Sequence, residues 1–253
     1  MPHAKKATLV FLHGFAESPA IWTDFTRGFP AHYRLLMPAL PGHGPQPQPV
    51  TDYSMEAQAQ AVLAQLDAAG AEKVLLVAHS MGGYVALALA DAHPERVAGL
   101  VLFHSTALPD TDEKRENRTK NQDFIRRHSL DKFMNSFIRP LLAPANRERL
   151  GTELQQLEAI GKATPEVTIL GGLEAMKHRP DRTQVLRDAR FPVLFISGHD
   201  DPAVPLDTLL PQLALPAQSH ALLLQGVGHL GFIEAPELTR RAVLDFAAGV
   251  FGK

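Results

Sequence analysis

Short apolar runs recur along the chain and constrain its fold more than any other feature of the sequence. Each run is rich in Val, Leu and Ile, and its apolarity is continuous rather than alternating, which is typical of parallel strands covered on both faces. Helical patterns lie between the runs; at 54–70, for example, Ser54 can cap a helix and Gly70 can end it. The runs occupy 7–13, 34–39, 73–79, 99–104, 192–197 and 221–226. This alternation predicts an α/β fold with a doubly wound, mostly parallel sheet of about six strands.

The alternation stops between about residues 106 and 188, where no strand-like run occurs and charged residues are dense. Phe133 and Phe137 recur there at helical spacing, beside Met134. We therefore expect a helical cap at 106–188, inserted between two strands of a core formed by 1–105 and 189–253. Phe133, Met134 and Phe137 are candidates for lining a substrate pocket beneath the cap, with ordinary core packing as the competing interpretation.

Charge and composition narrow the classes of partner and of site. The net charge of -2 and the interspersed Lys, Arg, Asp and Glu residues give no basic stripe, which argues against nucleic acid. The absence of cysteine excludes a thiol nucleophile and thiolate metal sites. No apolar run reaches the roughly 18 residues of a membrane span, and the first is too short for a signal peptide. We expect no membrane partner and a cytoplasmic location, with monomer and homodimer both open.

One serine lies between a strand-like run and a helical pattern in "VLLVAHSMGGYVALALA", residues 74–90. A tight turn at Ser80 would strain its backbone and lift the hydroxyl clear of the sheet, which requires small residues two positions before and after it. Ala78 and Gly82 meet that requirement. The helix that follows would offer free backbone N–H groups to a developing oxyanion. Ser80 is therefore a candidate nucleophile.

This stretch resembles the nucleophile elbow G-x-S-x-G of the α/β-hydrolase family, with Ala78 in place of the first glycine. The resemblance implies a carboxylate and a histidine later in the chain. "FPVLFISGHDDPAVP" resembles the family's acid loop, and its spacing places the acid at Asp201 rather than Asp200. "GVGHLGFIEAPE" resembles the histidine loop and implies His229 as the base.

Two further stretches extend the resemblance towards the N-terminus. "LVFLHGF" resembles the H-G-x motif, which implies the Phe15 N–H as one oxyanion donor and the Met81 N–H as the other, with His13 bracing the loop. "PALPGHG" at 38–44 resembles a D-x-P-G-x-G loop in which Ala39 replaces the acid. His79, directly before Ser80, is expected to point elsewhere by strand alternation.

The resemblance implies a serine hydrolase that cleaves small to medium carboxylic esters through an acyl-enzyme, without a cofactor or metal ion. One alternative is a lyase or carbon–carbon bond hydrolase on the same triad, similar to family members of menaquinone synthesis. Such an enzyme needs basic groups, for which Arg126, Arg127 and Arg139 are candidates. The other alternative is a catalytically silent module that binds a small molecule.

Overall fold

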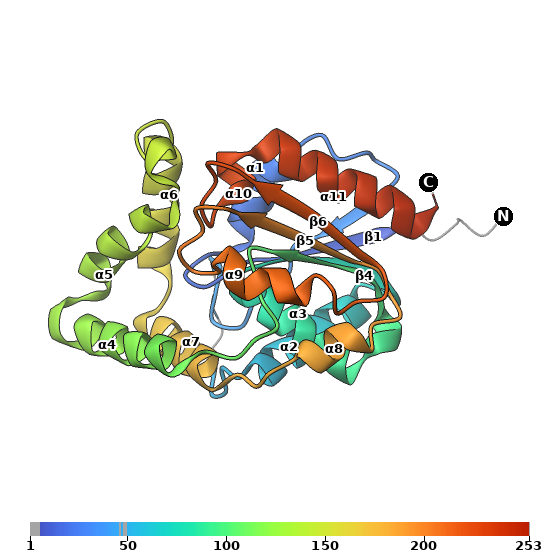
Figure 1. Cartoon of the computed structure of the whole chain (residues 1–253). Coiled ribbons are helices and arrows are strands. Elements are labelled where there is room, and N and C mark those ends of the chain that lie inside the picture. The colour runs from blue at the N-terminus through green and yellow to red at the C-terminus, as the bar shows by residue number, and fades with distance from the viewer. Residues whose placement is uncertain (1–5, 46, 48–49, 253) are drawn as a thin grey trace.

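A computed structural model, which describes residues 6–45, 47 and 50–252, contains a sheet of six strands in the order β2-β1-β3-β4-β5-β6 (Figure 1). Every neighbouring pair is parallel. The strands are β1 (Thr8–Leu12), β2 (Arg34–Leu36), β3 (Val74–His79), β4 (Val97–Phe103), β5 (Val193–Gly198) and β6 (Ser219–Leu224). Each of the six apolar runs overlaps a strand, although β4 and β6 each begin two residues before their runs and β2 ends three residues before its run does. The predicted parallel sheet is confirmed.

Helices cover both faces of this sheet, as the continuous apolarity of the runs predicts (Figure 1). On one face lie α1 (Trp22–Phe25), α10 (Gly231–Glu234) and α11 (Pro236–Phe251); on the other lie α2 (Met55–Ala68), α3 (Met81–Ala92) and α8 (Thr183–Arg187). The short helix α9 (Leu206–Leu209) connects β5 to β6. Every residue of β1, β3 and β5 is buried, because helices cover these strands above and below.

A cluster of aromatic side chains packs helices α1 and α10 against the sheet. Trp22 of α1 lies with its ring centroid 5.4 Å from that of Phe11 and 5.5 Å from that of Phe232 of α10. Trp22 and Phe11 are fully buried. Tilted and edge-to-face contacts of this kind add about 0.5–1.5 kcal/mol each beyond burial. They join α1 and α10 to the sheet next to the loops that follow β1 and β6.

Helix α2 begins and ends where the sequence predicts. The Ser54 hydroxyl accepts a hydrogen bond from the Ala57 N–H at 3.2 Å, and Gly70 has φ +63°, a conformation that favours glycine. Val62 and Leu66 are buried on the side that packs on α3.

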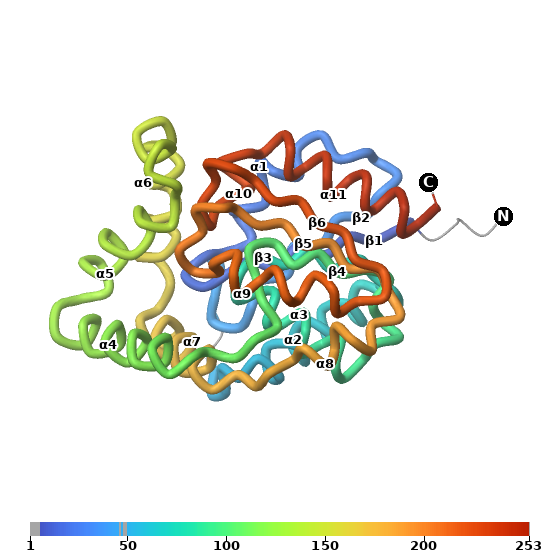
Figure 2. The backbone as a smooth tube through the Cα atoms, in the orientation of Figure 1, coloured from blue at the N-terminus to red at the C-terminus, as the bar shows by residue number. Residues whose placement is uncertain are grey.

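The segment between β4 and β5 contains only helices among its described residues, and most of them stand beyond the carboxyl ends of the strands (Figures 1 and 2). They are α4 (Asp112–His128), α5 (Leu130–Phe137), α6 (Gly151–Ala163) and α7 (Glu166–His178). Helix α4 packs on α5 and α7, and α5 packs on α6. By contrast, α8 contacts α3 beneath the sheet. The division into a core and a cap at 106–188 stays a prediction.

Among the described residues, we find no helix with the length and apolarity that a membrane crossing requires.

Candidate active site

Ser80 occupies a strained turn between β3 and α3. Its φ of +49° and ψ of −117° lie outside the conformations that a serine ordinarily adopts. A Cβ added to Gly82 would lie 2.6 Å from the backbone oxygen of His13, so this position requires glycine. Ala78, in contrast, sits fully buried within β3 and pairs with Leu12 and Leu102. Alanine is therefore accommodated where the family motif has its first glycine.

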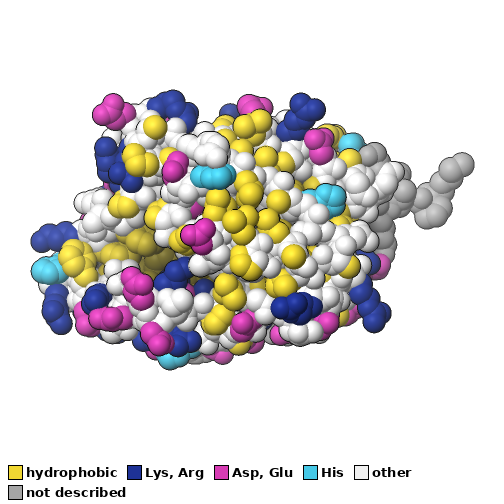
Figure 3. Space-filling view, viewed as in Figure 1, with side chains coloured by type: hydrophobic (Ala, Val, Ile, Leu, Met, Phe, Trp, Pro, Cys, Tyr) yellow, Lys and Arg dark blue, Asp and Glu magenta, His cyan; other side chains and the backbone are white. Residues whose placement is uncertain are grey.

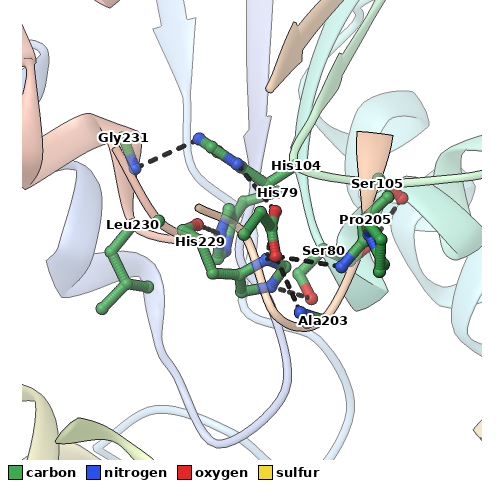
Figure 4. A network of polar contacts seen from close by, with 12 residues as sticks. His79, Ser80, His104, Ser105, Ala203, Pro205, His229, Leu230 and Gly231 are labelled. Carbon is green, nitrogen blue, oxygen red and sulfur yellow. Dashed lines mark hydrogen bonds and ion pairs between the residues drawn. The ribbon is translucent and has the colours of Figure 1, made fainter. Parts of the chain in front are cut away.

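The turn brings Ser80 to His229, although the two residues are far apart in the sequence (Figure 4). The Ser80 Oγ lies 2.9 Å from His229 Nε2, and His229 Nδ1 lies 2.9 Å from both carboxylate oxygens of Asp201. An ionised carboxylate only accepts, so Nδ1 carries a proton and Nε2 is free to accept the serine O–H. Asp200, by comparison, is exposed at the surface. The structure brings together Ser80, His229 and Asp201 in the geometry that nucleophilic catalysis by serine requires.

Asp201 accepts hydrogen bonds from more than His229. The backbone N–H groups of Ala203 and Val204 donate to Oδ1 at 2.8 and 2.9 Å. Burial alone would raise the pKa of the Asp201 carboxyl, but the charge of a protonated His229 and the hydrogen bonds from His104 and His229 outweigh burial and hold that pKa below its ordinary value. The carboxylate is therefore ionised throughout the pH range in which a histidine titrates.

His104 is a second histidine on this carboxylate, and the sequence interpretation missed it. Its Nδ1 lies 2.9 Å from Asp201 Oδ2, and its Nε2 accepts the Gly231 N–H at 3.2 Å (Figure 4). Since Nε2 accepts, the neutral ring carries its proton on Nδ1 and donates it to Asp201. Burial lowers the pKa of His104 despite the opposing effect of Asp201, which agrees with this neutral form. His104 directly follows β4, which pairs with β5. Because sites in parallel sheets lie beyond the carboxyl ends of the strands, this position could have identified it as a site residue.

His79 and Glu17 connect the two loops that flank Ser80. His79 Nδ1 lies 2.9 Å from Glu17 Oε2, and its Nε2 lies 3.0 Å from the backbone oxygen of His229. The same Glu17 oxygen accepts the Gly14 N–H at 2.5 Å. Both ring nitrogens of His79 thus face acceptors, which indicates a charged imidazolium. Burial lowers the pKa of His79, but the charge and hydrogen bond of Glu17, with the His229 carbonyl and Asp201, raise it overall.

The His79 ring bonds Glu17 and the His229 carbonyl rather than the Ser80 hydroxyl, so it supports the histidine loop. That loop is also held from its other side by Glu234, a buried residue that the sequence interpretation did not single out. Glu234 accepts the N–H groups of Gly228 and Leu230 within the loop, at 3.0 and 3.1 Å, and that of Ala143 at 2.9 Å. The position of His229 is therefore fixed by backbone contacts on both sides.

The loop after β1 lies against Ser80, as the H-G-x resemblance implies. A Cβ added to Gly14 would lie 2.8 Å from Glu17 Oε2 and 3.1 Å from Ser80 Cβ, so the loop approaches the serine closely and a side chain there would displace its neighbours. His13 braces the loop by donating from Nδ1 to the Gly14 carbonyl at 2.9 Å and accepting the Leu40 N–H at Nε2. Phe15 follows in this loop, and Met81 is the first residue of α3, so its N–H has no acceptor inside the helix. Their role as oxyanion donors stays a prediction.

A cavity of about 600 Å³ opens over Ser80 and His229, between the sheet and helices α4 and α5. Figure 3 shows the hollow, with hydrophobic side chains in its depth and Lys and Arg side chains along one edge. Phe133 and Phe137 line it, with their rings stacked at a centroid distance of 5.0 Å, and Phe15 meets Phe137 edge-on at 5.6 Å. A larger cavity of about 850 Å³, lined by Lys73, Pro94 and Phe191 among others, contains none of the candidate residues.

Met134 does not line the cavity, which corrects its prediction as a substrate contact. The side chain is fully buried, and its sulfur would lie 2.6 Å from a Cβ added to Gly161 of α6. Phe133 and Phe137 are four residues apart and share one face of α5, whereas Met134 is rotated by about 100° from Phe133. Met134 therefore packs α5 on α6, as the competing interpretation of core packing expects.

His104, Asp201 and His229 form the one group among the described residues whose ligand atoms converge closely enough to hold a metal ion, within 4.8 Å. Both Nδ1 atoms donate to Asp201, while the Nε2 atoms face the Gly231 N–H and the Ser80 hydroxyl. Two backbone N–H groups also donate to the carboxylate. A cation would have to displace these donors, so the group fits a hydrogen-bonded network rather than a cation site.

Comparison with known proteins agrees with this architecture. The chain is 28% identical to the pimeloyl-[acyl-carrier protein] methyl ester esterase of Yersinia enterocolitica, covering 94% of this chain and 92% of that protein. It is 30% identical to the 2-hydroxy-6-oxononadienedioate/2-hydroxy-6-oxononatrienedioate hydrolase of Klebsiella pneumoniae, covering 96% and 88%. The solved structure of a thermophilic esterase from Thermogutta terrifontis, with malate bound, superposes with a TM-score of 0.89 at 26% identity, covering 96% and 90%. The family model of the alpha/beta hydrolase fold matches residues 7–236, and the chain therefore belongs to the α/β-hydrolase family.

Proposed function

We propose that this protein is a serine hydrolase that cleaves small to medium carboxylic esters through an acyl-enzyme intermediate. The observation that carries the proposal is the continuous hydrogen-bonded path from Ser80 Oγ through His229 to Asp201, with each step at 2.9 Å. A serine hydroxyl is a poor nucleophile unless a base removes its proton, and this path supplies the base and the group that orients it.

In the acylation step, Ser80 Oγ attacks the ester carbonyl carbon while His229 Nε2 takes the hydroxyl proton. The negative charge that develops on the carbonyl oxygen is stabilised by the N–H groups of Phe15 and Met81. The tetrahedral intermediate collapses with cleavage of the bond to the alcohol oxygen, and His229 returns the proton to that oxygen. The alcohol leaves, and the acyl group remains as an ester of Ser80.

Deacylation repeats these steps with water as the nucleophile. His229 removes a proton from water, the hydroxide adds to the acyl carbon, and collapse breaks the bond to Ser80 Oγ, which His229 reprotonates. Asp201 remains ionised throughout and stabilises the imidazolium that forms twice in each cycle. No cofactor enters this scheme, and no metal ion is required by it.

The names of several relatives support ester hydrolysis, since both the relative from Yersinia enterocolitica and the solved structure from Thermogutta terrifontis are named as esterases. A lyase or carbon–carbon bond hydrolase on the same triad is the alternative. It is supported by the relative from Klebsiella pneumoniae, which is named as a 2-hydroxy-6-oxononadienedioate/2-hydroxy-6-oxononatrienedioate hydrolase. A silent binding module is disfavoured by the triad geometry, which binding alone does not need.

A panel of p-nitrophenyl esters of increasing acyl length tests the proposal. We expect release of p-nitrophenol that saturates with substrate and disappears in Ser80→Ala. Failure to turn over any ester, with a correctly folded protein, would contradict ester hydrolysis. From the sequence, we further propose that the protein is located in the cytoplasm and is a monomer or a homodimer.

A further inference from the structure

The cavity over Ser80 has two walls of different chemistry. Helix α5 and the loop after it contribute apolar side chains such as Phe133 and Phe137. Helix α4 contributes five polar or charged side chains, followed by Phe124. The five residues are Lys114, Asn117, Arg118, Lys120 and Asn121. Lys114, Asn117 and Asn121 recur at intervals of three and four residues. Arg118 and Lys120 are next to Asn117 and Asn121, so the five residues form one face of α4, which is directed into the cavity.

The charge of this face is of one sign. Among the described residues that line the cavity, the only carboxylate is Glu17, which already accepts from Gly14 and His79. The acidic residues of α4 do not line the cavity; Asp112 pairs with Arg115 and Asp123 with Arg126 outside it. Helix α4 carries cations on both sides, but none of its carboxylates lines the cavity, so every charged residue that it contributes to the cavity is a cation.

Several donors on this face have no hydrogen-bond partner among the described residues. Lys114 Nζ donates one hydrogen bond, to the Ala203 carbonyl at 2.9 Å. Two of its three N–H groups therefore remain available to a ligand. Arg118 donates from Nε and Nη2 to Asp110, and its Nη1 donates to no residue in the described part of the chain. The side chains of Asn117 and Asn121 form no hydrogen bond with any described residue.

The excess of positive charge extends beneath the surface of the wall. Asp110 is buried and binds two guanidinium groups, those of Arg118 and Arg179. One carboxylate cannot neutralise two cations. Lys120 is the exception on this face, because Glu116 pairs with it at 2.8 Å in solvent.

We propose that the α4 wall of the cavity binds a carboxylate or other anionic group that the ester substrate carries apart from its scissile bond. This inference rests on the proposed ester hydrolysis and names the class of ester. Lys114 and Arg118 supply charge, and Asn117 and Asn121 supply neutral donors, while the apolar wall accommodates the chain between the two ends. Arg126, Arg127 and Arg139, the sequence candidates for such a role, do not line the cavity.

The geometry suits an elongated substrate. Lys114 reaches the loop that carries Asp201, since its partner Ala203 lies two residues further on. The face from Lys114 to Asn121 then extends for about 10 Å along α4. Anionic groups at several distances from the scissile carbonyl can therefore meet a donor.

Paired substrates test the proposal without knowledge of the natural one. The p-nitrophenyl monoesters of adipic and suberic acid are compared with p-nitrophenyl hexanoate and octanoate, which match them in acyl length and lack the carboxylate. A second pair, 4-carboxyphenyl and phenyl hexanoate, places the charge on the alcohol side. We expect kcat/KM to favour the charged member of at least one pair by roughly tenfold, and added salt to reduce that preference.

Substitutions on α4 locate the preference. Asn121→Leu removes a donor that has no other partner, and Lys114→Met removes the charge; each should reduce the ratio of charged to neutral turnover severalfold, and Lys114→Arg should restore it. The ratio is the readout, because Lys114 also contacts the acid loop and its loss can slow both substrates. Arg127→Gln, on the outer side of the same helix, is the matched control and should leave the ratio unchanged.

The outcomes separate this inference from the proposed function. Turnover of the neutral esters that depends on Ser80, with no preference for any charged partner, would overturn the anion site and leave ester hydrolysis standing. A preference for the charged esters that persists in both Asn121→Leu and Lys114→Met would also overturn the anion site, because the anionic group would then bind outside the α4 wall. Absence of turnover of every ester would contradict the proposed function itself.

Discussion

His104 Nδ1 lies 2.9 Å from Asp201 Oδ2, so two histidines donate to a carboxylate that orients one of them. His229 meets the candidate nucleophile, whereas His104 is fully buried behind the acid and reaches Gly231 on its far side. The carboxylate is therefore held from both sides, and His104 is a positioning residue in this arrangement.

Replacement of His104 tests that role. His104→Leu removes a hydrogen bond to a charged group, which contributes about 1.5–3 kcal/mol, so kcat/KM should fall roughly tenfold to hundredfold. With one donor fewer, the carboxylate attracts the His229 proton more strongly, and the acid limb of the pH–rate profile should move to higher pH. His104→Asn, whose amide can still donate, should recover part of both effects. A lower rate with an unmoved pH profile would mean that His104 only fills space.

Ser80→Ala should reduce ester turnover by roughly 10⁴-fold or more while the fold stays intact, because the triad acts as a unit. A fluorophosphonate probe should label the wild type at Ser80 and leave the variant unlabelled. Two nearby serines serve as internal controls: Ser105 donates its hydroxyl to the Ser80 carbonyl, and Ser197 is fully buried. Mass spectrometry that finds the label on either of them would move the nucleophile.

Asp201 and Asp200 are neighbours with opposite surroundings, which makes them a matched pair. Asp201→Asn should lower kcat by roughly 10⁴-fold, because the amide no longer holds His229 in the required tautomer. Asp200 is exposed, and Asp200→Asn should change kcat by less than about twofold. Steady-state kinetics that rank the two variants the other way would assign the acid to Asp200.

The sequence was sufficient for the sheet and for the number of its strands, but it placed the ends of β2, β4 and β6 two or three residues away from where they lie. Six apolar runs predicted six parallel strands, and three motifs at strand ends predicted Ser80, Asp201 and His229, which the structure brings within hydrogen-bonding distance. Periodicity and motif spacing are local, so they survive without knowledge of the fold.

Contacts between distant elements were beyond the same reasoning. The pairing of Glu17 with His79, and of His104 with Asp201, depends on which strands are neighbours and how far each loop extends. Met134 shows the same limit, since helical periodicity identifies an apolar residue but does not say whether a cavity or another helix faces it. Lys114 and Asn121 were indistinguishable from the many other polar residues of α4 until the fold directed one face inward.

The charge of His79 is open to direct measurement. Both of its ring nitrogens face acceptors, so long-range ¹H–¹⁵N spectra recorded across a pH titration should show the imidazolium persisting to higher pH than in an ordinary histidine. Glu17→Gln should return the ring to the neutral form and, by loosening Gly14, lower kcat more than it raises KM. A neutral His79 in the wild type would place the shared proton on Glu17 instead.

Buried histidines should also give the fold a stability maximum near pH 6.5, about the value at which an unfolded histidine titrates. Burial lowers the pKa values of His13, His43 and His104, so below this pH the unfolded chain binds more protons than the folded one, and the free energy of unfolding falls as pH decreases. His79 acts in the other direction. Its pKa is raised, so its contribution is complete below about pH 6.5 and is lost as pH rises through the folded value.

Urea unfolding across this range measures both limbs of the stability profile. Glu17→Gln removes the main group that raises the pKa of His79, so it should flatten the alkaline limb and leave the acid limb in place. An alkaline limb that persists unchanged in this variant would show that another group produces it. Stability that rises steadily as pH falls below about 6.5 would mean that the three other histidines are charged in the folded protein, against the burial and neutral hydrogen bonding of His13 and His104.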